Sequence, residues 1–227
     1  MRKPNRFILI SGAAAVLAIG LTTTTALAAT GSGHAGQSGA SRSGSWSVSP
    51  MNIVEGGDSV GQTVLADSTT GGEINCKSEG VGYDIKGGMG LKGTVTGKLA
   101  GITMQFGGCT LPDGTAVTVT ESNEWAMTGV RFDPSTNLGV TTGRWQGVDI
   151  SFSSSTCSGV LDGSAAGAND GILTYHFFNN PHWLIIQRFG GNLHAYNVTG
   201  CTGIFGNGDP VTMHTISTGT DIVITSP

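Results

Sequence analysis

Residues 175–186, with the sequence YHFFNNPHWLII, combine side chains that bind metal ions with side chains that bind flat ligands. Two histidines, His176 and His182, flank an Asn-Asn-Pro turn, and His194 follows further along the chain. Zinc and copper accept imidazole ligands, but a site needs at least a third ligand, and no compact motif such as HExxH is present. A metal site at His176, His182 and His194 is therefore the lesser alternative to histidines on a partly buried strand.

The aromatic side chains of the same stretch have two interpretations. A hairpin loop of three residues, 179–181, would place Phe177 opposite Trp183. Exposed tyrosine and tryptophan rings form platforms for sugar rings or anchors for a protein partner. An alternating strand must bury one face, however, and aromatic cross-strand pairs commonly stabilise sheets. We expect Phe177 and Trp183 to lie in the core, and Tyr175, Phe177 and Trp183 form a possible ligand surface as the alternative.

Catalytic and cofactor motifs do not emerge from the sequence. There is no G-x-S-x-G, and Asp149, Asp162 and Asp170 could form a carboxylate pair for glycoside hydrolysis only through the fold. The G-x-G-x-x-G within residues 88–93 is followed by β-branched residues instead of the helix that a dinucleotide site needs. The sequence predicts no catalytic residue and no cofactor.

The elements that position these residues are predicted to be short strands. Alternating apolar positions recur, and turn signals such as Asp-Gly and Asn-Gly separate them; the segments are 102–106, 116–120, 124–127 and 148–152. No segment after the N-terminal apolar run keeps the helical i, i+3, i+4, i+7 spacing. We expect an all-β fold, a single antiparallel sandwich or barrel.

An internal echo supports this fold class. Residues 93–106 align without gaps on residues 139–152, with apolar residues and glycines at matching positions. In both copies the apolar spacing slips from two to three at a glycine, Gly101 or Gly147. The slip predicts a β-bulge at each glycine.

Four cysteines, an even number, lie in the part with strand patterns: Cys76, Cys109, Cys157 and Cys201. Zinc sites with four cysteine ligands need closely spaced pairs, whereas here the closest two are 33 residues apart. Two disulfides are predicted, and three pairings are compatible with the sequence.

The N-terminus has the pattern of a secretory signal peptide over residues 1–28. A basic start precedes a 14-residue apolar run and an Ala-Leu-Ala cleavage site. The run is shorter than the roughly 20 residues of a membrane-spanning helix, so no stable membrane anchor is expected. Residues 29–45 are rich in glycine and serine and predict a flexible leader. A β-rich secreted domain follows over residues 46–227, with Trp46 expected to be half exposed at its entry.

The charge of the chain excludes some partners. Removal of residues 1–28 leaves eight basic and fifteen acidic residues, a net charge of −7, with no basic cluster. Such a field repels phosphate backbones and anionic lipid surfaces, so nucleic-acid binding is not expected.

The cysteine and glycine pattern resembles an uncharacterised family of small secreted actinobacterial β-rich proteins that have a signal peptide and four cysteines. The resemblance depends on the runs INC, GTVTG, GC…GNGD and the closing ITSP, and covers roughly residues 72–227. It implies export, a β-rich fold and pairing in chain order, Cys76 with Cys109 and Cys157 with Cys201. It brings no activity and no site residues.

Together these features predict a secreted, extracellular, non-catalytic protein that binds an envelope polymer, a small apolar ligand or another protein. A secreted hydrolase with a site assembled across loops is the alternative, and metal capture is a third hypothesis. A hydrolase predicts titratable groups converging in a cleft, whereas a binding module predicts an exposed aromatic patch or an apolar cavity.

Overall fold

The computed structural model describes residues 45–49, 53–59, 61–85, 91–92, 99–135, 137–218 and 221–226, all within the compact unit Ser41–Pro227. The predicted signal peptide, the leader up to residue 44, and Gly88, Gly90 and Gly93 lie outside these residues. The secondary structure assigned in the described ranges consists of strands, and no helix there is long and apolar enough to cross a membrane. The predicted all-β class is confirmed.

The described residues form eighteen strands. The first nine are β1 (Ser45–Ser49), β2 (Ile53–Ser59), β3 (Thr63–Asp67), β4 (Glu73–Cys76), β5 (Ser78–Ile85), β6 (Leu91–Lys92), β7 (Ala100–Gly107), β8 (Cys109–Thr110) and β9 (Ala116–Glu121). The others are β10 (Trp125–Asp133), β11 (Val140–Val148), β12 (Ile150–Ser153), β13 (Ser158–Asp162), β14 (Gly171–Phe178), β15 (Trp183–Ile186), β16 (His194–Thr199), β17 (Val211–Thr218) and β18 (Val223–Thr225).

Eight of these strands pair antiparallel in a closed ring. Its order is β2, β5, β7, β10, β11, β14, β15 and β17, and β17 pairs again with β2. Alternate residues point inward, so the ring has a core of large side chains that includes Trp125, Trp145, Tyr175 and Phe177, all at most 1% exposed. A closed ring leaves no free edge among its members, which removes the sites at which strands of other chains could add. This part of the fold is a barrel.

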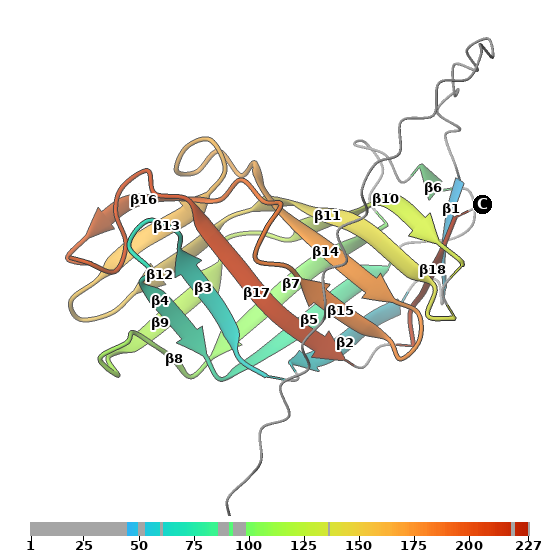
Figure 1. Ribbon diagram of the computed structural model, residues 1–227, viewed down its shortest axis with the longest axis horizontal. Helices are drawn as coiled ribbons and strands as arrows, with labels where there is room; N and C mark the ends of the chain where they lie inside the picture. Colours follow the sequence, from blue (N-terminus) through green and yellow to red (C-terminus); the bar gives the residue numbers. More distant parts are fainter. Residues whose placement is uncertain are drawn as a thin grey trace, which may run out of the picture. The chain divides into compact units, whose positions relative to one another are not determined.

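Strand β17 extends beyond this ring (Figure 1). Its C-terminal half pairs with β15 and β2, whereas its N-terminal half, Val211–His214, pairs with β3. From β3 the sheet continues through β4, β8, β9, β12, β13 and β16. Disulfides join Cys76 to Cys109 and Cys157 to Cys201, the pairing that the family resemblance implied. Both crosslinks lie in this second group of strands and its connecting segments.

A small sheet, β18-β1-β6, adds Trp46 to the core. Trp46 is only 4% exposed, so the expected half-exposed position is wrong. Its ring lies against Gly129 of β10, where an added Cβ atom would come within 2.6 Å of the indole. Only glycine leaves room for the ring at this position.

The β14–β15 hairpin has a different loop from the one expected. Phe178 pairs with Trp183 and Phe177 with Leu184, so the loop has four residues, 179–182, instead of three. The loop contains a cis Asn180–Pro181 bond and His182 with a φ of 65°. Because side chains alternate between faces, one extra loop residue moves every side chain of β15 to the opposite face.

One of the two predicted bulges is confirmed. At Gly147, with φ of 78°, the register between β11 and β14 shifts between Gln146 and Val148. The bulge predicted at Gly101 is wrong, because Gly101 pairs in regular register with Ala126. There the apolar spacing of three falls at the start of β7, where Leu99 precedes the strand and its N–H donates to Met127 O (2.7 Å).

The exposures of Trp46 and Trp183, 4% and 41%, predict that truncation destabilises the fold far more at Trp46 than at Trp183. We expect Trp46→Ala to lower the free energy of unfolding by about 3–5 kcal/mol, as for other buried aromatic residues. Trp183→Ala should lower it by less than about 1.5 kcal/mol. Urea unfolding with the disulfides intact measures both, and equal losses would contradict the placement of the two side chains.

Candidate binding surface

Five apolar side chains gather on the outward face of the barrel. In one row across the sheet, Val140 lies opposite Phe178 and Phe178 opposite Trp183; in the next, Ile185 lies opposite Ile216. Residues directly opposite in antiparallel strands share a face, so these five form one surface. We call it the outer aromatic face. Trp183 is 41% exposed and the other four are half-buried.

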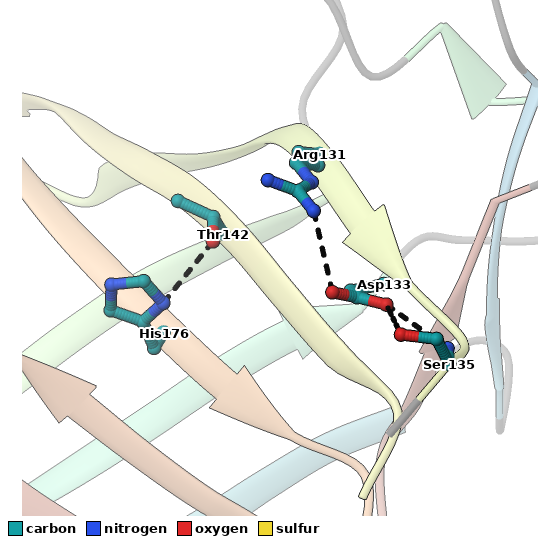
Figure 2. Close-up of polar contacts among 5 residues, drawn as sticks. All are labelled: Arg131, Asp133, Ser135, Thr142 and His176. Carbon is teal, nitrogen blue, oxygen red and sulfur yellow. Dashed lines mark hydrogen bonds and ion pairs between the residues drawn. The ribbon is translucent and has the colours of Figure 1, made fainter. Parts of the chain in front are cut away.

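Polar side chains border this face along β10 and β11 (Figure 2). His176 continues the row of Ile185, and its Nδ1 lies 3.1 Å from Thr142 Oγ1. At the end of β10, Arg131 donates to Asp133 (3.3 Å), and Asp133 accepts a further bond from the Ser135 hydroxyl (2.5 Å). The surface thus offers an apolar strip beside groups that donate and accept hydrogen bonds.

The three residues of the predicted ligand surface do not lie on one face of the sheet. Tyr175 and Phe177 are 0% and 1% exposed, so their assignment to a ligand surface is wrong, whereas the core position of Phe177 is confirmed. For Trp183 the expected core position is wrong, because the side chain is exposed. The exposure of Trp183 follows from the extra loop residue, because Leu184 and Ile186 occupy the inward positions of β15.

The candidate histidines do not converge. His182 Nδ1 lies 3.0 Å from Ile222 O, and His194 Nδ1 lies 2.9 Å from Asn192 O. A carbonyl oxygen only accepts, so both rings donate through Nδ1, and His176 contacts a threonine on another strand. Among the described residues no group of three or more His, Cys, Asp or Glu could hold a metal ion.

A carboxyl pair forms through the fold instead, between Asp149 and Asp162. The register pairs Ile150 with Leu161, and extending it by one residue places Asp149, which precedes β12, opposite Asp162 at the end of β13. Burial raises the pKa of Asp149; the Ser122 hydroxyl bond (3.1 Å) opposes this shift, and the charge of Asp162 adds to it. Asp149 and Asp162 are 6% and 0% exposed.

Asp162 holds the loop that follows β13. Its carboxylate accepts the backbone N–H groups of Gly163 (2.6 Å), Asn169 (3.0 Å) and Asp170 (3.2 Å). A buried carboxylate that accepts several N–H bonds organises the backbone around it. The pair therefore stabilises the hairpin and its loop. It does not resemble a substrate-facing acid pair, which must be open to a ligand.

A half-buried acid, Glu121, lies close to this pair at the end of β9. Glu121 accepts the Met104 N–H (2.7 Å), and burial, followed by the charge of Glu124, raises the pKa of Glu121. This carboxylate also bonds to backbone, and its role is to join β9 to β7.

The raised pKa of Asp149 predicts a pH dependence of stability. The folded protein holds the Asp149 proton more tightly than the unfolded chain, so this residue contributes stability that is lost as the pH rises above its ordinary pKa of 3.8. Asp149→Asn removes this loss, and its stability relative to the wild type should therefore increase between about pH 3 and pH 7. Urea unfolding at both pH values measures the difference.

Asp113→Asn is the matched control. Backbone and side-chain bonds from Thr115 lower the pKa of Asp113, so the stability of this variant relative to the wild type should decrease over the same range. If the difference in unfolding free energy between Asp149→Asn and the wild type did not change with pH, the burial of the Asp149 carboxylate would be contradicted.

No protein-family model, no characterised protein and no solved structure matches the chain.

Proposed function

We propose that this is a secreted, non-catalytic binding protein whose outer aromatic face docks on a neutral polysaccharide of a cell envelope or extracellular matrix. The observation that carries the proposal is the position of Trp183, which is 41% exposed on the barrel, whereas the other tryptophans of the chain, at positions 46, 125 and 145, are at most 4% exposed. An exposed indole beside half-buried Phe178 costs free energy in water, and a ligand that covers both recovers it.

Several features support a carbohydrate. Sugar rings have apolar C–H faces that pack on aromatic rings, and hydroxyl groups around them that need hydrogen-bond partners. The outer aromatic face offers the rings of Phe178 and Trp183, and its border offers His176, Thr142 and Asp133. These side chains lie on adjacent antiparallel strands, a surface suited to an extended polymer. The net negative charge of the chain, −4 over its full length, favours a neutral polymer over an anionic one.

The location is part of the proposal. Disulfides persist in oxidising compartments, and the two crosslinks support an extracellular location. The N-terminal pattern supports export, and the resemblance to secreted actinobacterial proteins remains a hypothesis that agrees with it.

Export predicts a defined mass for the protein recovered from culture supernatant. We expect a mature chain that begins at Ala29 and carries no free thiol, because cleavage follows the Ala-Leu-Ala site and all four cysteines are paired. Denaturing mass spectrometry without reduction measures both. A chain that retains residues 1–28, or that reacts with a thiol reagent, would contradict this route.

The polysaccharide proposal predicts the effect of a single truncation. Wild-type protein should sediment with microcrystalline cellulose or chitin, and Trp183→Ala should weaken that binding about tenfold or more, or roughly 1.4 kcal/mol. Trp183→Phe should recover part of the affinity, because a ring remains.

Phe189→Ala is the matched control, since Phe189 is 81% exposed beyond the other end of β15. Its binding should equal that of the wild type. Failure of the wild type to bind either polymer, or equal binding by Trp183→Ala, would refute a neutral polysaccharide as the ligand.

A further inference from the structure

Two buried indole groups inside the barrel lack hydrogen-bond partners. Trp125 on β10 and Trp145 on β11 are both 0% exposed, and their ring centroids lie 5.7 Å apart. Neither Nε1 atom has a hydrogen-bond partner in the structure. An indole N–H can only donate, and buried donors without an acceptor are rare in native proteins.

The neighbouring tyrosine shows what these donors lack. Tyr175, whose ring lies 6.4 Å from that of Trp145, donates its hydroxyl to Thr128 O at 3.1 Å. A third buried polar atom without a partner, Thr141 Oγ1, faces inward from the same strand as Trp145. The inward residues of β10, β11 and β14, among them Trp125, Trp145 and Tyr175, carry no charge. This part of the interior therefore suits a neutral group that accepts hydrogen bonds.

The barrel wall is interrupted close to these groups. Strand β15 ends at Ile186, whereas β14 and β17, its two neighbours, both continue past that level. Residues 187–193 cross the gap as a loop, and a cavity of about 290 Å³ that opens to solvent lies beneath it. Leu173 and Met213 line this cavity, and both side chains belong to the inward faces of their strands. Leu173 is the direct cross-strand neighbour of Trp145.

The loop over the cavity is attached by separate bonds near its two ends and at Gly190. Gln187 N–H donates to Thr174 O (3.3 Å), and the Thr174 hydroxyl donates to Gly190 O. At the other end Asn192 N–H donates to Ile172 O (3.1 Å), the Asn192 side chain accepts the Ile172 N–H (2.6 Å), and Leu193 O accepts the Val211 N–H (2.8 Å). Gly190 has a φ of 98°, which residues with a side chain rarely adopt. A loop held by isolated bonds opens at a lower free-energy cost than a strand in a ladder.

From the unpartnered indole groups and the interrupted wall, we propose that the barrel interior binds a small, neutral, largely apolar molecule with a hydrogen-bond acceptor such as a carbonyl oxygen. The ligand enters beneath residues 187–193, passes Leu173 and accepts the N–H of Trp145, with Trp125 as the second donor. The cavity of about 290 Å³ forms the entrance to this site; Leu173 lines it and neither tryptophan does, so a ligand of one or two rings reaches the indoles by displacing the Leu173 side chain. This site is separate from the outer aromatic face and does not depend on the polysaccharide proposal.

Nuclear magnetic resonance tests the proposal directly, because each of the four tryptophans gives its own indole N–H signal. The two probes are acetophenone and cumene, which have similar shapes but differ in the carbonyl oxygen. Trp125→Phe and Trp145→Phe assign the signals in the ¹⁵N-labelled mature protein. We expect acetophenone to shift the Trp145 signal downfield in a saturable way and to bind about tenfold more tightly than cumene, or roughly 1.4 kcal/mol.

Three variants separate the alternatives. Trp145→Phe should reduce the affinity for acetophenone to that for cumene, because it removes the donor and keeps an aromatic ring. Thr212→Phe, at a half-buried position that lines the cavity, should weaken the binding of both probes. Trp183→Ala should change neither, so failure of the interior site is distinguishable from failure of the outer aromatic face.

Three results would overturn the interior site. The first is equal affinity for the two probes, and the second is an acetophenone shift confined to the exposed Trp183 signal. The third is a nuclear Overhauser effect from a long-lived water to both indole N–H groups in the protein without probe. In that case water would already serve as the acceptor.

Discussion

The register between β14 and β15 determines the arrangement of the barrel. Four loop residues, 179–182, separate Phe178 from Trp183, and this count places Leu184 and Ile186 inward. Strand β15 then pairs with β17 and closes the ring. With three loop residues the same strand would direct Trp183 and Ile185 into the core and two other apolar side chains outward. Closure of the ring and exposure of Trp183 therefore have one cause.

The polar residues of this loop hold it in place. The Asn179 side chain donates to Ile224 O (2.8 Å) and accepts the Ile224 N–H (2.8 Å), the pattern by which one strand pairs with another. His182 donates to Ile222 O. Strand β18 in turn pairs with β1, which carries Trp46 into the core. The loop thus connects the hairpin to the small sheet, and its histidine is committed to a structural bond.

The sequence predicted the fold class, the two crosslinks and the inward residues of regular strands such as β12. It did so because a two-residue alternation and cysteine spacing are local signals. The register of β15 could not be predicted, because residues 183–186 are apolar at every position and no alternation distinguishes the two faces. The pairing of Asp149 with Asp162 was hidden for a different reason. It depends on the β12–β13 register, which brings the residue before β12 opposite the last residue of β13.

Most polar groups of the described residues that could have destabilised the fold have partners. Asp162 accepts three backbone N–H groups, and Tyr175 donates to a carbonyl oxygen. Against this background two features depart from the rule that buried donors are bonded and large apolar rings are covered: the unpartnered indoles of Trp125 and Trp145, and the exposed rings of Trp183 and Phe189. Natural proteins concentrate such departures at functional sites, where a ligand supplies what the chain does not. The two features differ in kind, since the indole N–H groups need a hydrogen-bond acceptor, whereas the exposed aromatic rings need an apolar group that covers them. A barrel with a polymer on its outer face and a small molecule in its interior satisfies both.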